Sequence, residues 1–184
     1  MSEAASPDVL IWLDLEMTGL DVESDRIVEI AALATDTELR ALDDGIDLVV
    51  HQPDDVLGRM NTVVEKMHTK SGLLPAIRAS ELTLEEAGAR VLEYVKTHAP
   101  EPRTVPLCGN SIGVDRRFLD RYLPALEAHL HYRSIDVSSV KELARRWYPD
   151  AHRHRPPKGE SHRALADVRE SIAELAYYRE AVFR

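Results

Sequence analysis

Asp14 and Glu16 follow a continuous apolar run, residues 9–13. This run is typical of a buried strand, although so short a stretch is also compatible with a buried helix. In a strand, both carboxylates project from the same face, roughly 7 Å apart. Neighbouring buried carboxylates need either a raised pKa or a divalent cation, and their oxygens suit Mg²⁺ or Mn²⁺. Alternatively, the pair marks only the exposed end of the strand before a turn at residues 18–19.

Three residues further along the chain have side chains suited to the same chemistry. Asp115 lies early in an expected helix, and His162 and Asp167 lie five residues apart near the start of another. Within a continuous helix this spacing turns two side chains about 140° apart. His162 and Asp167 therefore converge only if the histidine lies at a frayed first turn. Taken singly, each acid is also compatible with a helix-dipole partner, and the histidine with a solvated side chain.

The elements that must position these residues alternate in type along the chain. Residues 9–13, 26–35 and 45–50 read as strands, and their close succession predicts an antiparallel meander. Residues 54–80 predict short helices. Residues 83–98 predict a longer helix that begins at a capping box formed by Thr83 and Glu86.

The second half predicts strands at residues 104–108 and 132–136, with helices after each. The turn at residues 109–111 stands at a helix start, a place whose free amides suit an anion. Residues 149–159, with Arg153, Arg155 and Lys158, read as a mobile loop, and residues 161–179 as the longest helix. The order favours an α/β fold with a mixed sheet flanked by helices.

Composition indicates one globular domain spanning residues 1–184, with a flexible N-terminus at residues 1–8. Of the 184 residues, 44% are hydrophobic and 30% charged. No apolar run approaches the roughly 18 residues of a membrane span, so we expect no membrane association. The one cysteine, Cys108, excludes an internal disulfide and agrees with a cytoplasmic location.

The charge balance limits the partners. Lys and Arg number 23 against 32 Asp and Glu, for a net charge of −9. Proteins that hold long nucleic acids neutralise many phosphates with basic side chains. A nucleic-acid substrate of this chain is therefore either short or bound by a segregated basic patch.

In this order, the four acids and His162 make the sequence resemble the DEDDh 3′-to-5′ exonucleases, and among them the oligoribonucleases. The resemblance runs from about residue 9 to residue 179. It is densest in residues 12–20, 108–113, 141–147 and 174–180. It implies an RNase H-like mixed five-stranded sheet flanked by helices, and hydrolysis of short oligoribonucleotides, dinucleotides above all, to 5′-mononucleotides at the end of RNA degradation.

The same resemblance implies a role for each residue of the site. It makes Asp14, Glu16, Asp115 and Asp167 the ligands of two divalent cations, Mg²⁺ or Mn²⁺, and His162 the general base. Two ions roughly 4 Å apart suit phosphodiester hydrolysis, and an imidazole with an ordinary pKa near 6.5 accepts a proton at neutral pH.

For the substrate, the resemblance implies an apolar base contact and a cap on the 5′ phosphate. Leu20 is the base contact, and the cap consists of His68, Ser111, Arg133 and Ser138. Tyr132 stacks on a base from the second subunit of a homodimer. A cap at the phosphate end needs no extended basic face, which fits the acidic charge. Two of these residues have other readings, Ser138 as a helix N-cap and Arg133 as a surface ion-pair partner.

One position departs from the family. Val63 stands where the family often has a tryptophan, so base stacking, worth about 1–3 kcal/mol, is expected to be weaker. Two alternative functions remain. One is an exonuclease of the same class that acts on longer DNA or RNA ends. The other is a non-catalytic nucleotide-binding protein, which the presence of all five site residues disfavours.

Overall fold

The protein was examined as a computed structural model that describes residues 9–157, 159 and 161–183. Two expectations concern residues outside the described ranges. They are the flexibility of residues 1–8 and the place of Lys158 in a basic loop. Within the described chain, five strands form one sheet in the order β3-β2-β1-β4-β5. The strands are β1 (Val9–Met17), β2 (Ile27–Asp36), β3 (Ile46–Val49), β4 (Pro106–Gly109) and β5 (His131–Asp136).

β1 lies at the centre of the sheet because both of its faces are apolar. It pairs antiparallel with β2 along its whole length and parallel with β4 at Ile11 and Trp12. Trp12 faces one core, whereas Leu13 and Leu15 face the other. This alternation sends Asp14 and Glu16 to the same side of the sheet as Trp12.

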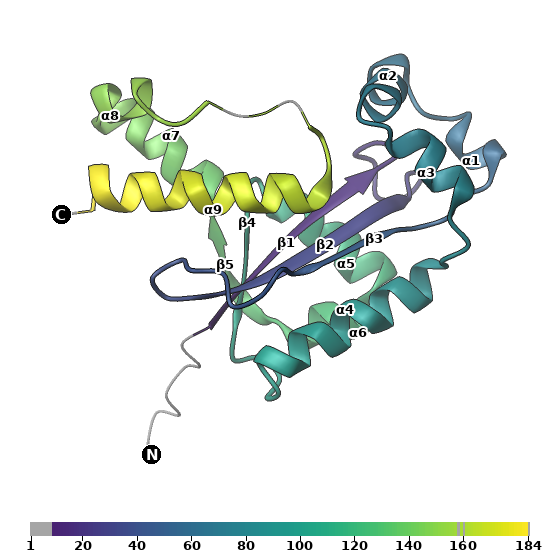
Figure 1. Ribbon diagram of the computed structural model, residues 1–184, viewed down its shortest axis with the longest axis horizontal. Helices are drawn as coiled ribbons and strands as arrows, with labels where there is room; N and C mark the ends of the chain where they lie inside the picture. Colours follow the sequence, from purple (N-terminus) through teal and green to yellow (C-terminus); the bar gives the residue numbers. More distant parts are fainter. Residues whose placement is uncertain (1–8, 158, 160, 184) are drawn as a thin grey trace.

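Helices cover both faces of the sheet (Figure 1). On the Trp12 face, α7 and α9 pack through Val137, Ala164 and Val168. On the opposite face, α4, α5 and α6 enclose the larger core. The helices are α1 (Asp54–Leu57), α2 (Thr62–Lys70), α3 (Leu73–Ala79), α4 (Leu84–His98), α5 (Gly113–Tyr122), α6 (Pro124–His129), α7 (Val137–Trp147), α8 (Pro149–Arg153) and α9 (Ala164–Ala181).

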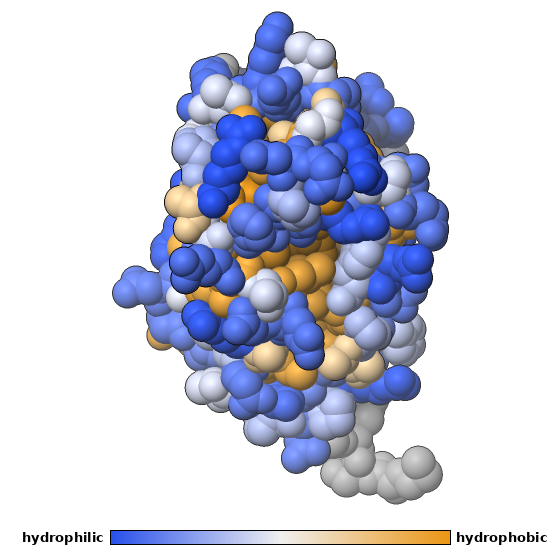
Figure 2. All heavy atoms as spheres, turned by 90° about the vertical axis from the view of Figure 1, so that its right-hand side faces the viewer, coloured by the Kyte–Doolittle hydropathy of each residue, from blue (hydrophilic) through white to orange (hydrophobic). Residues whose placement is uncertain are grey.

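The short helices α1–α3 form a smaller layer at the end of the sheet where β1 terminates (Figure 1). They bury Leu57, Leu73, Leu74 and Ile77 against Val28 of β2. Viewed from this side, apolar atoms are exposed in the middle of a largely hydrophilic face (Figure 2). No helix in the described part of the chain is long and apolar enough to cross a membrane.

The predicted α/β fold, its antiparallel meander and the Thr83–Glu86 capping box are confirmed. Two expectations are wrong. Residues 149–159 are not wholly a loop, because α8 occupies Pro149–Arg153 with a proline in its first turn, where its missing N–H costs nothing. Ser138 is not the N-cap of α7, because Asp136 takes that position and accepts the Ser138 amide.

Candidate active site

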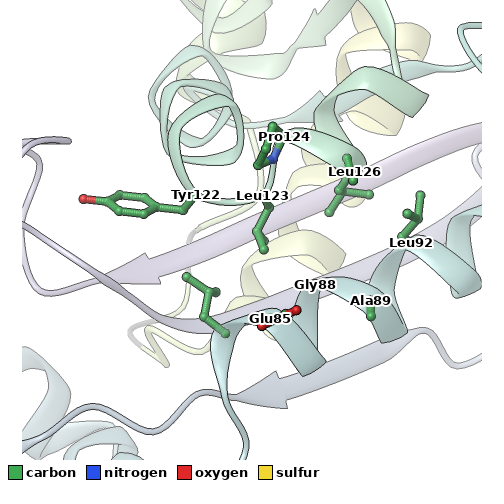
Figure 3. A pocket seen from close by; sticks show the side chains of 10 residues that line it. Glu85, Gly88, Ala89, Leu92, Tyr122, Leu123, Pro124 and Leu126 are labelled. Carbon is green, nitrogen blue, oxygen red and sulfur yellow. The ribbon is translucent and has the colours of Figure 1, made fainter.

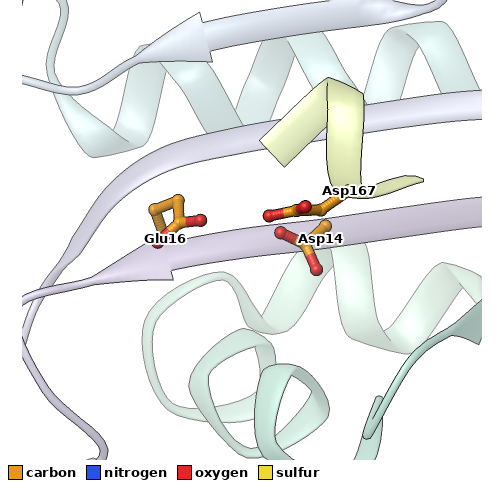
Figure 4. A group of neighbouring side chains, drawn as sticks. All are labelled: Asp14, Glu16 and Asp167. Carbon is orange, nitrogen blue, oxygen red and sulfur yellow. The ribbon is translucent and has the colours of Figure 1, made fainter. Parts of the chain in front are cut away.

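The end of β1 and the first turn of α9 bring three carboxylates together. Asp14, Glu16 and Asp167 each offer an oxygen, and these oxygens lie within 4.8 Å of one another. Figure 4 shows Asp14 and Glu16 on β1 with Asp167 of α9 beside them. The two-residue period of a strand puts the first two on one side, and the packing of α9 on that side supplies the third.

Electrostatics mark this cluster as unfavourable without a positive partner. Glu16 is 8% exposed, and its pKa is raised to about 8, first by burial and then by the neighbouring Asp167, Glu29 and Asp115 charges. Arg163 opposes this shift. A buried carboxylate that resists losing its proton in this way, beside two other carboxylates, fits a divalent cation, whose charge and preference for oxygen ligands offset both effects.

Asp115 joins the site from α5 on the opposite face of the sheet. Its Oδ1 accepts a hydrogen bond of 3.0 Å from the Leu15 amide. β4 pairs with β1 only at Ile11 and Trp12. Beyond those residues, the Asp115 carboxylate accepts a backbone N–H of β1 as a carbonyl of a neighbouring strand would. Burial raises the pKa of Asp115 to about 7. Asp115 therefore reaches the strand that carries Asp14 and Glu16 but lies outside the group of three close carboxylates.

His162 lies just before α9, in the segment that leads into the helix. Its φ of 44° is in the left-handed region, which costs a side-chain-bearing residue about 1 kcal/mol or more. The next two residues are held by Glu29, whose carboxylate accepts from Arg163 Nε at 2.8 Å and from the Ala164 amide at 2.9 Å. Glu29 is fully buried on β2, so this contact fixes the start of α9 and the backbone beside His162.

A small cavity of about 180 Å³ joins these residues. Asp14, His162, Asp167 and Ser111 all line it, so the histidine and the acid that are five residues apart in sequence face one space. They do so because His162 precedes the helix and Asp167 lies in its first turn. The remaining lining residues are Asn110, Gly159 and Ser171.

A larger cavity lies elsewhere and does not suit hydrolysis. It measures about 540 Å³ and lies between α4 and the α5–α6 corner (Figure 3). Most of its lining is apolar, from residues such as Leu84, Leu92, Leu123 and Leu126, and Glu85 is its acidic residue. We therefore assign the chemistry to the smaller, polar cavity, because a mostly apolar lining with one carboxylate supplies neither a histidine base nor a cluster of metal ligands.

Two predicted substrate contacts are exposed at the surface. Leu20 is 68% exposed in the turn after β1. The turn is tight because the Asp25 carboxylate accepts from Thr18 Oγ1 and the Asp21 amide, and a Cβ on Gly19 would lie 2.3 Å from that carboxylate. Tyr132 is 75% exposed on β5.

The predicted phosphate contacts Ser111 and Ser138 meet at Asp136. The Ser111 amide donates to Asp136 Oδ1 at 2.8 Å, and Ser138 Oγ donates to both oxygens at 2.8 Å. The turn pattern predicts free amides that would suit an anion. The Ser111 amide is already bonded to Asp136, so this prediction is wrong for that residue. Arg133 lies nearby on β5 with its guanidinium 5.5 Å from the centre of the Tyr132 ring.

His68 lies deeper than a surface phosphate contact. It is fully buried on α2, where Nε2 is 2.9 Å from the Met17 carbonyl and Nδ1 is 3.9 Å from Glu16 Oε2. Burial lowers the pKa of the imidazole below its usual 6.5. In this conformation His68 is neutral at pH 7 and adjoins the acidic cluster. Its contact with a phosphate remains a prediction.

Sequence reasoning did not single out Glu29 or Asp136, although both hold site residues in place. Glu29 carried a visible signal, since it is a lone acid within the apolar stretch of residues 27–34. A charge at such a position is buried with β2 and must find a partner. Asp136 carried a weaker one, an Asp two residues before Ser138 at a helix start, which is an ordinary N-cap pattern.

Comparison with known proteins agrees with this geometry. The sequence matches the RNase_T family, described as Exonuclease, over residues 11–175. The oligoribonuclease of Streptomyces avermitilis is 57% identical over 176 residues, which cover 96% of this chain and 88% of that protein. The oligoribonuclease of Nocardia farcinica is 53% identical over 178 residues, covering 97% and 82%.

Solved structures support the fold. E. coli exonuclease I in complex with a dT13 oligonucleotide superimposes with a TM-score of 0.74 at 18% identity. The match covers 96% of this chain and 42% of exonuclease I, so this chain spans about two fifths of that protein. The sheet order and the acidic cluster define an exonuclease of the RNase H-like class.

Within that class, the chain belongs to the oligoribonuclease family. The predicted family and fold are thereby confirmed, as is the prediction of a nuclease. The family and the acidic cluster together indicate the use of divalent metal.

Proposed function

We propose that this chain is a 3′-to-5′ exoribonuclease that hydrolyses very short oligoribonucleotides, dinucleotides above all, to 5′-mononucleotides. The observation that carries the proposal is the cavity shared by His162 and the carboxylates of Asp14 and Asp167, with Glu16 beside them. Membership of the oligoribonuclease family supports the choice of substrate.

The residues take complementary roles in hydrolysis. Asp14, Glu16, Asp115 and Asp167 would hold two divalent cations, with Mg²⁺ or Mn²⁺ proposed because the ligands are carboxylates. When bound, the cations would acidify the attacking water and offset the charge that develops on the phosphate.

His162 acts as the general base, accepting the proton of the attacking water on an imidazole nitrogen. A bond then forms between the water oxygen and phosphorus, and the bond from phosphorus to the 3′ oxygen breaks. The 3′ oxygen leaves and takes up a proton. Glu29 keeps His162 in place through Arg163 and the Ala164 amide.

Recognition is proposed to lie at the 5′ end of the substrate. Arg133, Ser111 and Ser138, with His68, would cap the 5′ phosphate, and Leu20 would contact a base. Arg133 suits this part because its planar fork bonds two phosphate oxygens at once. The exposed ring of Tyr132 would stack on a base bound to a second copy of the chain in a homodimer. The cytoplasm is the proposed compartment, where short RNA fragments from decay are the substrates.

The test is turnover of a 5′-labelled diribonucleotide compared with a ten-residue RNA and a ten-residue DNA, each with Mg²⁺, Mn²⁺ or chelator. We expect strong preference for the dinucleotide and loss of turnover with chelator. Preference for the longer strands would leave the exonuclease chemistry but discard the cap. Turnover of no substrate would favour a non-catalytic nucleotide-binding protein instead.

Two further tests address the recognition residues. Arg133→Ala should raise KM for the dinucleotide far more than for the ten-residue RNA, and equal effects would remove the cap. If Tyr132 acts across a dimer, a forced monomer should lose activity. A monomer that sedimentation confirms and that remains active would rule out this role.

A further inference from the structure

Arg116, the residue after Asp115 on α5, has its guanidinium fully engaged. The side chain is 17% exposed. Every acceptor that it meets lies on β5 or on α6. Nε donates to Glu127 Oε1 at 3.0 Å, Nη1 to the Tyr132 carbonyl at 3.1 Å, the Arg133 carbonyl at 3.5 Å and Ser134 Oγ at 2.8 Å, and Nη2 to the His131 carbonyl at 2.5 Å.

The start of β5 needs these donors because its ladder is interrupted. The register passes from the Pro106–His131 pair to the Leu107–Ser134 pair, so within the described strands Tyr132 and Arg133 are left out of the pairing. Pro106 has no N–H to offer. The guanidinium fork supplies donors to the carbonyls that the interrupted ladder leaves without a strand partner.

The same irregularity sets where the side chains point. Extra residues in one strand bend it and re-aim its side chains. Here the two residues left out are Tyr132 and Arg133, which are both exposed and stack on each other. The contacts of Arg116 therefore fix the backbone of the two residues proposed to meet the substrate.

We propose that Arg116 is a positioning residue for substrate length, an inference that rests on the proposed function. Asp115 and Arg116 are adjacent on one helix, so α5 fixes the distance between the acidic site and the Tyr132–Arg133 pair. The charge of Arg116 is already paired with Glu127, so Arg116 is not proposed as a phosphate ligand. With the distance fixed, a dinucleotide spans both ends of the site, whereas a longer strand runs past the cap.

The experiment compares Arg116→Lys with Arg117→Lys in the full chain. Lysine keeps the positive charge but lacks the planar fork, and the neighbouring Arg117 is an exposed matched control. We expect Arg116→Lys to raise KM for a diribonucleotide by about tenfold to a hundredfold, as small displacements in a site do. Its kcat and its KM for a ten-residue RNA should change much less, and Arg117→Lys should change neither.

Hydrogen exchange supplies a readout that does not depend on activity. The amides of residues 131–134 should exchange faster in Arg116→Lys than in Arg117→Lys. Should Arg116→Lys fail to fold, Glu127→Gln, which weakens the contact to Nε, should shift KM for the dinucleotide in the same direction by a smaller factor.

Unchanged kinetics, or an equal loss on both substrates, would overturn the proposal and leave Arg116 a structural residue. If the wild-type protein shows no preference for the dinucleotide, the proposed function fails. The positioning role is then upheld only if Arg116→Lys raises KM without lowering kcat for the substrate that is turned over, and it is overturned if it does not.

Discussion

At the end of β1, Glu16 is 8% exposed and lies among other acids, whereas at the start of β5, Tyr132 is 75% exposed beside an arginine. In the first region, burial and the neighbouring acids keep the pKa of Glu16 high, and Arg163 opposes the shift. In the second region the backbone carbonyls have hydrogen-bond partners, because Arg116 donates to three consecutive ones. The first region is suited to binding a cation, and the second is anchored by Arg116.

This difference separates chemistry from recognition. The acidic cluster gains its function from electrostatic instability, which a cation relieves. In the proposed function, the β5 edge depends on geometric stability, which would keep exposed side chains in place without burying them. Changes to the first region should therefore act through charge, and changes to the second through position.

The largest effect should come from removing one charge of the acidic cluster. Asp14→Asn keeps the side-chain shape, and we expect activity to fall by roughly a thousandfold or more, about 4 kcal/mol. Melting of the chelated protein should not become easier, because one repulsive charge is gone. Asp120→Asn on the exposed side of α5 is the control and should keep full activity. A folded Asp14→Asn protein with most of its activity would contradict the metal-ligand role.

The next effect concerns the stability of the protein in chelator. The pKa of Glu16 is about 8 in the folded chain against 4.5 for the free side chain, and that of Asp115 about 7 against 3.8. Between these limits the folded protein holds protons that the unfolded chain has lost. Stability therefore falls as pH rises from about 5 to 8, by about 1.4 kcal/mol per pH unit for each group that keeps a proton the unfolded chain has lost.

Denaturant titrations across this pH range, with and without Mg²⁺, check the effect. The lowered pKa of Asp136 acts in the opposite sense at acidic pH below this window, and the lowered pKa of His68 acts in the opposite sense within it. Glu16→Gln should flatten the slope in chelator, and so should Mg²⁺ with the wild-type protein. An unchanged slope in Glu16→Gln would show that the cluster is not the source.

A smaller loss should follow when the support of the acidic site is weakened. Glu29→Gln keeps the size of the side chain but removes the charge that pairs with Arg163 at the start of α9. Displacement of the His162 backbone should lower kcat by about tenfold to a hundredfold, near 2 kcal/mol, with KM little changed.

The control for Glu29→Gln uses the other end of the same helix. Glu38 pairs with Arg179 of α9, and both side chains are about half exposed. Exposed pairs contribute about 0–1 kcal/mol, so Glu38→Gln should leave kcat and melting unchanged. If both variants behave alike, the buried pair has no special part in positioning His162.

The contrast between the two regions also explains what the sequence predicts well. The strands and long helices follow from apolar periodicity, and the Thr83–Glu86 pattern marked the start of α4 correctly. Asp14 and Glu16 could be identified from the sequence because two charges directly after an apolar run conflict with burial. The sequence pattern therefore predicts those features that neighbouring residues determine.

Prediction stopped where the cause was tertiary. Nothing near Arg116 shows that its guanidinium bonds the carbonyls of β5, because those carbonyls lie 15 to 17 residues further along the chain. The interruption that leaves them free of strand partners arises from the pairing of Pro106 with β5. Likewise, nothing in the sequence around His68 shows that its ring is buried against the Met17 carbonyl at the end of β1. Residues that act through distant backbone leave no periodic or compositional sign.

The smallest expected effect comes from a single exposed residue on α2, Val63. Val63 is 76% exposed in the first turn of α2, and its amide is held by the Asn61 cap at 3.0 Å, so a larger side chain there leaves the backbone unchanged. Val63→Trp should lower KM for a diribonucleotide by roughly fivefold, about 1 kcal/mol, by adding a ring for a base to stack on. Val63→Leu adds apolar area without a ring and should change KM little. If both substitutions act equally, the gain comes from apolar area rather than stacking, and the tryptophan common in the family at this position is not what orders the base.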